Sequence, residues 1–272
     1  MALGLVVALP ASGADLSGET NLPTPYIPST SLAVDEMLRV AEVKPNDLVV
    51  DLGSGDGRIV IAAARDYGAR GLGIDIDAKL VAQSIENARK AGVADRVAFR
   101  HGDALKAEID DATVVTLYLL PNLVEKLKPR LLAHLKPGTR IVAHDFGFAD
   151  WIPDRQVTIS KNYFLYVVPA RVAGKWRLQA ELPGGARDYE IDFEQNFQRI
   201  RGGTRVAGGY LPAFDAQLAG DRIRFVLVEN DTSHHFEGRV DGQLIEGVVR
   251  SGFGRERPTN RWRATRAAPE KG

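Results

Sequence analysis

The chain of 272 residues contains no cysteine, which excludes disulfide bonds, thiolate metal sites and cysteine nucleophiles. It also has no excess charge, because 35 Lys and Arg residues balance 35 Asp and Glu residues. Such a balance argues against mainly electrostatic binding of nucleic acid, although a local basic patch is compatible with it. No apolar run is long enough to cross a membrane. We therefore expect neither a nucleic-acid partner nor a membrane span.

The composition is that of a globular protein, with 44% hydrophobic and 26% charged residues, and the length suits one large or two modest domains. Residues 3–10 are apolar, and small residues follow at 11–14. This resembles the last part of a secretory signal, although no basic residue precedes it. A disordered tail is the alternative interpretation of residues 1–20. The expected compartment is cytoplasmic, or periplasmic or secreted if the stretch ends a signal peptide.

The centre of the chain is a glycine-rich turn between a strand and a helix. Val49 and Val50 end an apolar strand, residues 51–57 read DLGSGDG, and an apolar helical run begins at Ile59. Such a turn presents backbone N–H groups at the carboxyl edge of an α/β sheet, where ligands bind. The third glycine comes one residue earlier than in the dinucleotide fingerprint. Asp51 and Asp56 would repel a pyrophosphate, so the turn suits a ligand with a cationic amino group and a sulfonium.

Two further strands end in acidic residues. Asp75 ends the strand 71–75, and Asp103 follows the strand 96–100. A carboxylate at the first position can accept hydrogen bonds from both ribose hydroxyls of a nucleoside, and Asp103 is placed to accept one from an adenine amino group. Three acidic strand ends in register are more specific than the glycine turn alone.

Together these motifs resemble those of the class I, seven-stranded S-adenosylmethionine-dependent methyltransferases. The resemblance implies S-adenosyl-L-methionine as the cofactor and a doubly wound, mostly parallel, Rossmann-like sheet. The cofactor-binding residues that we predict are Pro28, Ser29, Asp51, Gly53, Ser54, Gly55, Asp56, Gly57, Asp75, Asp103 and Ala104.

A narrower resemblance concerns the acceptor of the methyl group. Residues 25–30 read PYIPST and resemble an arm that folds over the cofactor in ATP synthase c-subunit lysine methyltransferases and a broad-specificity archaeal protein-lysine methyltransferase. The stretch from Ala112 to Trp151 also resembles the archaeal enzyme. The fourth strand ends in Tyr118 and continues LLP, which departs from the Asp/Asn-Pro-Pro-aromatic motif of nucleic-acid amino methyltransferases. The resemblance implies a protein lysine as the acceptor.

A lysine amine, with a pKa of about 10.4, has to lose its proton before it can attack, and an apolar, aromatic channel lowers that pKa by desolvation. The residues predicted to act on the amine are Tyr118, Asp145 and Tyr26, with Asp145 orienting the amine or accepting its proton. The residues predicted to line the channel are Leu120, Pro121, Phe146 and Trp151. For Tyr118 and Phe146, core packing at strand ends is the alternative.

The five histidines show no metal-ligand spacing with a carboxylate partner, so we predict no metal site. His144 is interpreted as a surface residue at a strand end.

The remaining elements alternate between strand and helix up to about residue 169, with a closing antiparallel hairpin around Lys161-Asn162. Helices are predicted at 32–40, 59–67, from Asp77 to before Gly92, and at 123–135 with a kink at Pro129. Residues 21–172 are therefore assigned to the methyltransferase domain.

Beyond Pro169, helical patterning gives way to short alternating runs separated by turn glycines. The runs are 176–180, 189–197, 204–210, 214–218, 222–228, 235–240, 244–249 and 261–265. We predict a small all-β antiparallel barrel or sandwich over residues 173–272, similar to a calycin-type barrel, with Trp176 and Trp262 in contact where it closes. It would bind an apolar ligand, recruit a protein substrate or pack on the sheet, and the latter two roles are favoured.

The function that the sequence predicts is that of an S-adenosylmethionine-dependent protein-lysine N-methyltransferase. A small-molecule methyltransferase with the same cofactor domain is the first alternative, and a deep, closed pocket would favour it. The second alternative is an exported ligand-binding protein whose methyltransferase domain is residual. The intact glycines and acidic residues of the cofactor motifs argue against such decay.

Overall fold

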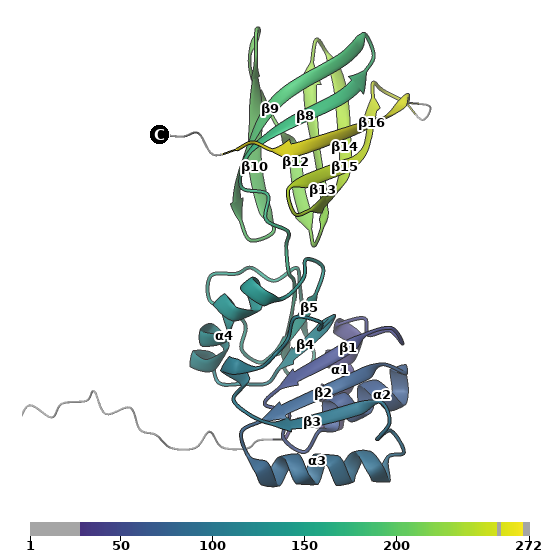
Figure 1. The fold of residues 1–272 in the computed structure, drawn as a ribbon, viewed down its shortest axis with the longest axis vertical. Coiled ribbons are helices and arrows are strands. Elements are labelled where there is room, and N and C mark those ends of the chain that lie inside the picture. Colours follow the sequence, from purple (N-terminus) through teal and green to yellow (C-terminus); the bar gives the residue numbers. More distant parts are fainter. Residues whose placement is uncertain (1–27, 255–256, 269–272) are drawn as a thin grey trace, which may run out of the picture.

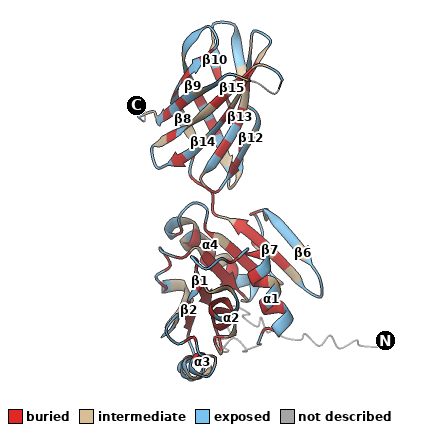
Figure 2. Cartoon of the chain, turned by 90° about the vertical axis from the view of Figure 1, so that its right-hand side faces the viewer, coloured by how far each residue is buried: buried red, intermediate tan, exposed pale blue. Residues whose placement is uncertain are grey.

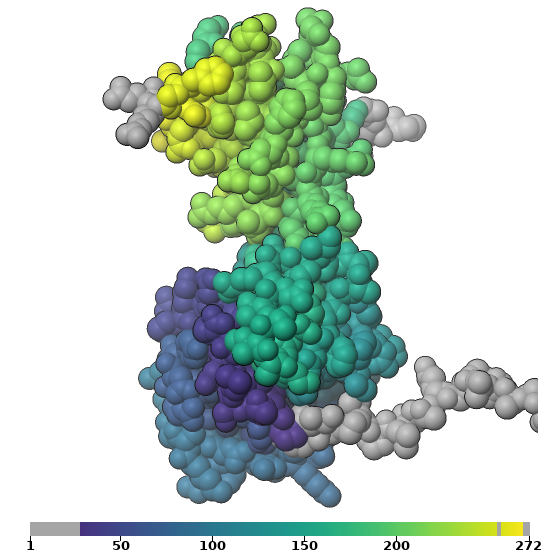
Figure 3. All heavy atoms as spheres, turned by 180° about the vertical axis from the view of Figure 1, so that it is seen from behind, coloured from purple at the N-terminus to yellow at the C-terminus, as the bar shows by residue number. Residues whose placement is uncertain are grey.

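The computed structural model describes residues 28–254 and 257–268. Figure 1 shows an α/β unit and a barrel of strands stacked along the long axis of the molecule, and Figure 3 shows the same two lobes in space-filling view. Tyr26 and the N-terminal apolar stretch lie outside the described residues. Within those residues, the helices are too short or too polar to traverse a lipid bilayer.

The first sheet has seven strands in the order β3-β2-β1-β4-β5-β7-β6, all parallel except β7. The strands are β1 Leu48–Leu52, β2 Arg70–Asp75, β3 Val97–His101, β4 Val114–Leu117, β5 Arg140–His144, β6 Arg155–Thr158 and β7 Asn162–Val167. The predicted parallel sheet and its antiparallel hairpin are confirmed. The strand order reverses between β1 and β4, so the carboxyl ends of β1, β2, β4 and β5 meet at the edge where ligands of such sheets bind.

Helices cover both faces of this sheet. The helices are α1 Ser31–Val40, α2 Arg58–Tyr67, α3 Ala78–Lys90 and α4 Pro121–His134, with a 3-10 turn η1 at Ala104–Lys106. One core joins α1 and α2 to Val49 of β1, and a second core joins α4 to Val50. Because successive residues of β1 point to opposite faces and both faces are covered, the last four residues of this strand are buried inside the α/β unit, as the red strands of Figure 2 show.

The ends of the helices follow local signals in the sequence. Thr30 caps α1 by accepting a hydrogen bond from the Ala33 N–H at 3.2 Å, and Asp77 caps α3 by accepting one from Lys79. Gly68 ends α2 with a φ of +70°. The predicted helices at 59–67 and from Asp77 to before Gly92 are therefore confirmed.

The last third of the chain is a closed antiparallel barrel. Its strands are β8 Gly174–Leu182, β9 Gly185–Asn196, β10 Arg199–Val206, β11 Gly209–Pro212, β12 Phe214–Ala219, β13 Arg222–Glu229, β14 Thr232–Asp241, β15 Leu244–Ser251 and β16 Thr259–Arg266. Each strand pairs with its neighbour in sequence, except that β10 takes both β11 and β12, and β16 returns to β8 to close the ring. The predicted run at 204–210 is wrong in its extent, because the chain turns between Val206 and Gly209.

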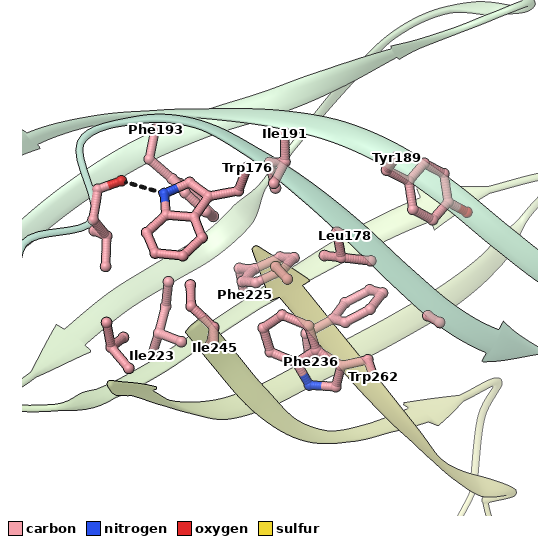
Figure 4. Packing of buried hydrophobic residues seen from close by; sticks show 14 of the residues in the cluster. Trp176, Leu178, Tyr189, Ile191, Phe193, Ile223, Phe225, Phe236, Ile245 and Trp262 are labelled. Atoms are coloured by element: carbon pink, nitrogen blue, oxygen red, sulfur yellow. Dashed lines mark hydrogen bonds between the residues drawn. The ribbon is translucent and has the colours of Figure 1, made fainter. Parts of the chain in front are cut away.

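Aromatic side chains fill the interior of the barrel (Figure 4). Phe225 stacks on Phe236 with ring centroids 4.8 Å apart, and Trp262 meets both rings edge-on. Trp176 lies in another part of this core, donates a hydrogen bond to the Val172 carbonyl and carries the Arg266 guanidinium over its ring. The expected contact between Trp176 and Trp262 is absent from the ring contacts of the described residues, because each indole has its own neighbours.

A compact joint connects the barrel to the sheet. Trp151, only 1% exposed, stacks on Phe197 with centroids 5.1 Å apart, and its indole N–H donates to the Gln198 side chain at 2.9 Å. The turn at Gly220 lies against Gly138, two residues before the start of β5. The barrel thus meets the amino edge of β5, and Trp151 belongs to this joint. The structure does not place Trp151 in a substrate channel.

The joint generates a stability prediction. Trp151→Ala should lower the free energy of unfolding by about 3–5 kcal/mol, because the lost indole leaves a cavity between Tyr166 and Phe197. The neighbouring Ile152 is half-exposed, so Ile152→Ala should change stability by less than about 1 kcal/mol. Denaturant unfolding of both variants measures the difference, and equal losses would contradict the role of the indole in the joint.

Candidate active site

The glycine turn between β1 and α2 has a backbone that only glycine adopts readily. Gly53, Gly55 and Gly57 have φ angles of +84°, +55° and +81°. The N–H groups of Gly53 and Ser54 donate to the Ile74 carbonyl at 2.8 and 3.0 Å, which ties the turn to the end of β2. A Cβ on Gly57 would lie 2.6 Å from the Phe99 ring. The turn is therefore both conformationally demanding and closely packed.

Asp51 is a buried carboxyl group at the end of β1. It is 2% exposed, and the Thr116 hydroxyl donates a hydrogen bond to it at 2.7 Å. Burial raises the pKa of Asp51 to about 7, the charges of Asp75 and Asp56 add to this, and the bond from Thr116 opposes it. A buried carboxyl group with a raised pKa favours a ligand that carries a positive charge.

Asp75 locks the turn in place from the end of β2. One carboxylate oxygen accepts a hydrogen bond from the Gly55 N–H at 2.7 Å, and the other accepts one from the Asp77 N–H at 2.9 Å. Asp103 follows β3 and accepts a hydrogen bond from the Leu105 N–H, and Ala104 begins η1 beside it. The three acidic strand ends therefore lie on adjacent strands, as the sequence predicts.

The other predicted cofactor residues surround the turn. Asp56 forms a bidentate ion pair with Arg58, whose guanidinium also donates a hydrogen bond to the Ser29 carbonyl. Ser29 is buried, whereas Pro28 is exposed. The Ser54 hydroxyl is buried and has no hydrogen-bond partner among the described residues. The start of the described chain is thus fastened to the glycine turn through Arg58.

A stack of three rings follows the ends of β4 and β5. The ring centroids of Tyr118 and His144 are 4.1 Å apart, and His144 stacks on Tyr163 at 5.1 Å. His144 is 3% exposed, and both of its ring nitrogens lack a hydrogen-bond partner in the described part of the chain. Burial lowers the pKa of His144, so the ring is neutral at pH 7. The interpretation of His144 as a surface residue is wrong, because Tyr118 and Tyr163 cover its two faces.

Asp145 lies next to this stack in a left-handed conformation, with a φ of +64°. Its N–H donates to the Asn162 carbonyl, and its carboxylate accepts a hydrogen bond from the Lys161 ammonium at 2.9 Å. Phe146 and Leu120 are each 42% exposed at the same edge, and Pro121 begins α4. Lys161 is not recognisable as a site residue from the sequence, because the turn around it signals only a hairpin.

Comparison with known proteins agrees with this geometry. Residues 51–155 match the model of the ANTKMT methyltransferase domain. The chain is 39% identical over 150 residues to a protein-lysine N-methyltransferase of Saccharolobus islandicus, covering 53% of this chain and 93% of the relative. The chain belongs to the class I S-adenosylmethionine-dependent methyltransferases.

Two further relatives of this methyltransferase differ in the acceptors that their names give. The adenine nucleotide translocase lysine N-methyltransferase of Mus musculus is 32% identical over 132 residues, and the alignment covers 48% of this chain and only 57% of the relative. A solved RNA methyltransferase from Salinibacter ruber, in complex with S-adenosyl-L-homocysteine, shows 50% identity and a TM-score of 0.53, with coverage of 54% of this chain and 96% of that one. The family model ends before the barrel begins.

The residues of the methyltransferase fit its cofactor. Within the described residues, the buried carboxyl group of Asp51 pairs with no cation and the buried Ser54 hydroxyl lacks a hydrogen-bond partner, and Ile76 is 74% exposed beside Asp75. We propose that Asp51 binds the amino group of S-adenosylmethionine, Asp75 the ribose and Asp103 the adenine amino group. Tyr26 stays a prediction because it lies outside the described residues.

The raised pKa of Asp51 generates a prediction about cofactor affinity. The ammonium of S-adenosylhomocysteine should bind the ionised carboxylate, so affinity should rise with pH between about 5.5 and 7 and level off above it, by at most about tenfold per pH unit. Calorimetric titrations across this range measure the effect. Asp51→Asn keeps an acceptor for Thr116 and should bind more weakly, with a flat pH profile; a profile as steep as that of the wild type would contradict the assignment.

The raised pKa of Asp51 also predicts that the stability of the ligand-free protein falls with rising pH, whereas cofactor affinity rises. Because the pKa of Asp51 is higher in the folded than in the unfolded chain, its contribution is fully present below about pH 4 and is lost as the pH rises through about 7. The ligand-free Asp51→Asn protein should therefore be more stable than the wild type at pH 8, by roughly 1–4 kcal/mol. Thermal unfolding without cofactor checks this sign, and a less stable variant would contradict it.

Proposed function

We propose that this methyltransferase transfers a methyl group to the side-chain amine of lysine in a protein. The observation that carries the proposal is the carboxylate of Asp145 beside the His144 ring, which stacks on the ring of Tyr118 where β4 and β5 end. An amine that arrives as an ammonium is attracted by the carboxylate, and the ring provides an apolar wall. The similarity to protein-lysine N-methyltransferases supports the same acceptor.

The residues of the site have two tasks toward the amine. Asp145 orients the ammonium through a charge-assisted hydrogen bond and accepts the proton that the amine loses before it attacks. The apolar stack of Tyr118, His144 and Tyr163 favours the neutral amine by excluding water. The bound cofactor supplies a methyl group already activated on a sulfonium. The protein therefore has mainly to place the deprotonated nitrogen close to that carbon and in line with the bond that breaks.

The surroundings of Asp145 suit a lysine carried on a protein surface. Leu120, Phe146 and the side chain of Lys161 are all partly exposed at this edge, so a side chain can reach it from outside. The barrel meets the opposite, amino edge of β5 through Gly220 and Trp151. The barrel therefore leaves the carboxyl edge of the sheet open to a protein substrate. We propose that the barrel either recruits that substrate or packs on the sheet.

RNA is a second candidate acceptor, because the structure from Salinibacter ruber is described as an RNA methyltransferase and shares 50% identity. The chain has no excess of positive charge to hold a phosphate backbone. Tyr118-Leu119-Leu120-Pro121 also lacks the acidic or amide residue that accepts a hydrogen bond from a base amino group. These two features favour lysine.

A transfer assay tests the proposal. Methyl-labelled S-adenosylmethionine is incubated with the purified protein and either a lysine-rich protein mixture or total RNA. We expect label on lysine, and a loss of at least about tenfold in Asp145→Asn, because the amide keeps the shape but loses the charge. Asn also tolerates the left-handed backbone at this position.

The affinity of Asp145→Asn for S-adenosylhomocysteine should equal that of the wild type, which separates acceptor binding from cofactor binding. Label on RNA alone would replace lysine by the second candidate. Label on lysine at the same rate in Asp145→Asn would remove Asp145 from the acceptor site.

A further inference from the structure

The carboxylate of Asp145 already holds an ammonium group in this structure. Lys161, in the turn between β6 and β7, donates a hydrogen bond from Nζ to Oδ2 of Asp145 at 2.9 Å. The hydrogen bond and the charge of Asp145 raise the pKa of Lys161, and the nearby Tyr118 and Tyr163 add to this. The Lys161 ammonium therefore occupies the carboxylate that we propose to hold the ammonium of a substrate lysine before that lysine loses its proton.

The backbone around this ion pair is firmly placed. The Asp145 N–H donates to the Asn162 carbonyl at 2.8 Å, and His144 pairs with Tyr163 in the register of β5 and β7. The Thr158 hydroxyl donates to the Asn162 side chain at 2.8 Å, across the turn that carries Lys161. Because these contacts do not involve the Lys161 side chain, it can leave Asp145 without any change in the strands.

Within the described part of the chain, two side chains that can carry a positive charge lie near the Asp145 carboxylate, those of His144 and Lys161. His144 lies beside it, with Nε2 4.0 Å from the carboxylate, but the ring is buried and stacked on both faces. Among the described residues, Lys161 is the ammonium that pairs with Asp145. An arriving lysine would therefore compete with Lys161 for one carboxylate.

We propose that Lys161 is an internal competitor, which occupies the acceptor-amine position until the lysine of a protein substrate displaces it. The inference rests on the proposed function, since it requires lysine as the acceptor. It adds a specificity-determining residue to the site. A free amine has to displace Lys161 without other help, whereas a lysine on a protein surface gains further contacts at the apolar rim of Leu120 and Phe146.

The expected size of the effect follows from the exposure of the pair. The Lys161 side chain is 54% exposed, and such pairs favour the bonded form over the open one by a factor of roughly one to five. Apparent affinity is reduced by the fraction of molecules in the open form. The competition should therefore raise the apparent Kd and KM for the acceptor by roughly two- to sixfold.

The test uses Lys161→Met, which keeps the length of the side chain and removes its charge. Lys136→Met is the matched control, because Lys136 forms an exposed ion pair with Asp111 at 3.0 Å, outside the site. For each protein, KM and kcat are measured with a lysine-containing peptide at saturating cofactor. Binding of the same peptide to the protein loaded with S-adenosylhomocysteine is measured by calorimetry.

We expect Lys161→Met to lower KM and Kd for the peptide by roughly two- to sixfold with little change in kcat, and Lys136→Met to match the wild type. Unchanged or higher values in Lys161→Met would overturn the inference, because Lys161 would then serve only to hold Asp145. If the wild type methylates the peptide and Lys161→Met gains nothing, only the competition is disproved. If no protein in the set methylates or binds the peptide, the proposed function fails, and the competition fails with it.

Discussion

The buried carboxyl group of Asp51 is the constraint on which the rest of the site depends. It lies at the end of a strand whose residues Val49 and Val50 are covered on opposite faces, so water cannot solvate its charge, and burial raises its pKa to about 7. Such a group destabilises the ligand-free protein at neutral pH. The glycine turn, locked by Asp75 through the Gly55 N–H, places this group where a cationic amino group can approach it.

The acceptor side follows from the same sheet order. β4 lies beside β1 on one side and β5 on the other, and Leu117 is opposite Ala143. The next residues, Tyr118 and His144, therefore meet as stacked rings, and Asp145 follows at the turn. The residues proposed to bind the cofactor and the acceptor thus share one edge of the sheet, while the barrel is joined at the opposite edge of β5.

Patterns that are local in the sequence predicted most of the fold. The glycine turn, the acidic strand ends and the alternation of the barrel strands each depend on near neighbours, and S-adenosylmethionine as cofactor agrees with the comparisons. Contacts between distant residues were missed. The burial of His144 depends on Tyr118 and Tyr163 on the neighbouring strands, and that of Trp151 depends on Phe197 from the barrel. The pairing of Lys161 with Asp145 requires the antiparallel register of β5 and β7, which the sequence alone does not define.

The most direct test is a crystal structure of the full chain with S-adenosylhomocysteine and a lysine-containing peptide. We expect the amino group of the cofactor to contact Asp51 and the peptide ammonium to contact Asp145, with the Lys161 side chain turned away. A peptide lysine bound elsewhere, with Lys161 still on Asp145, or a cofactor amino group without contact to Asp51, would contradict the account.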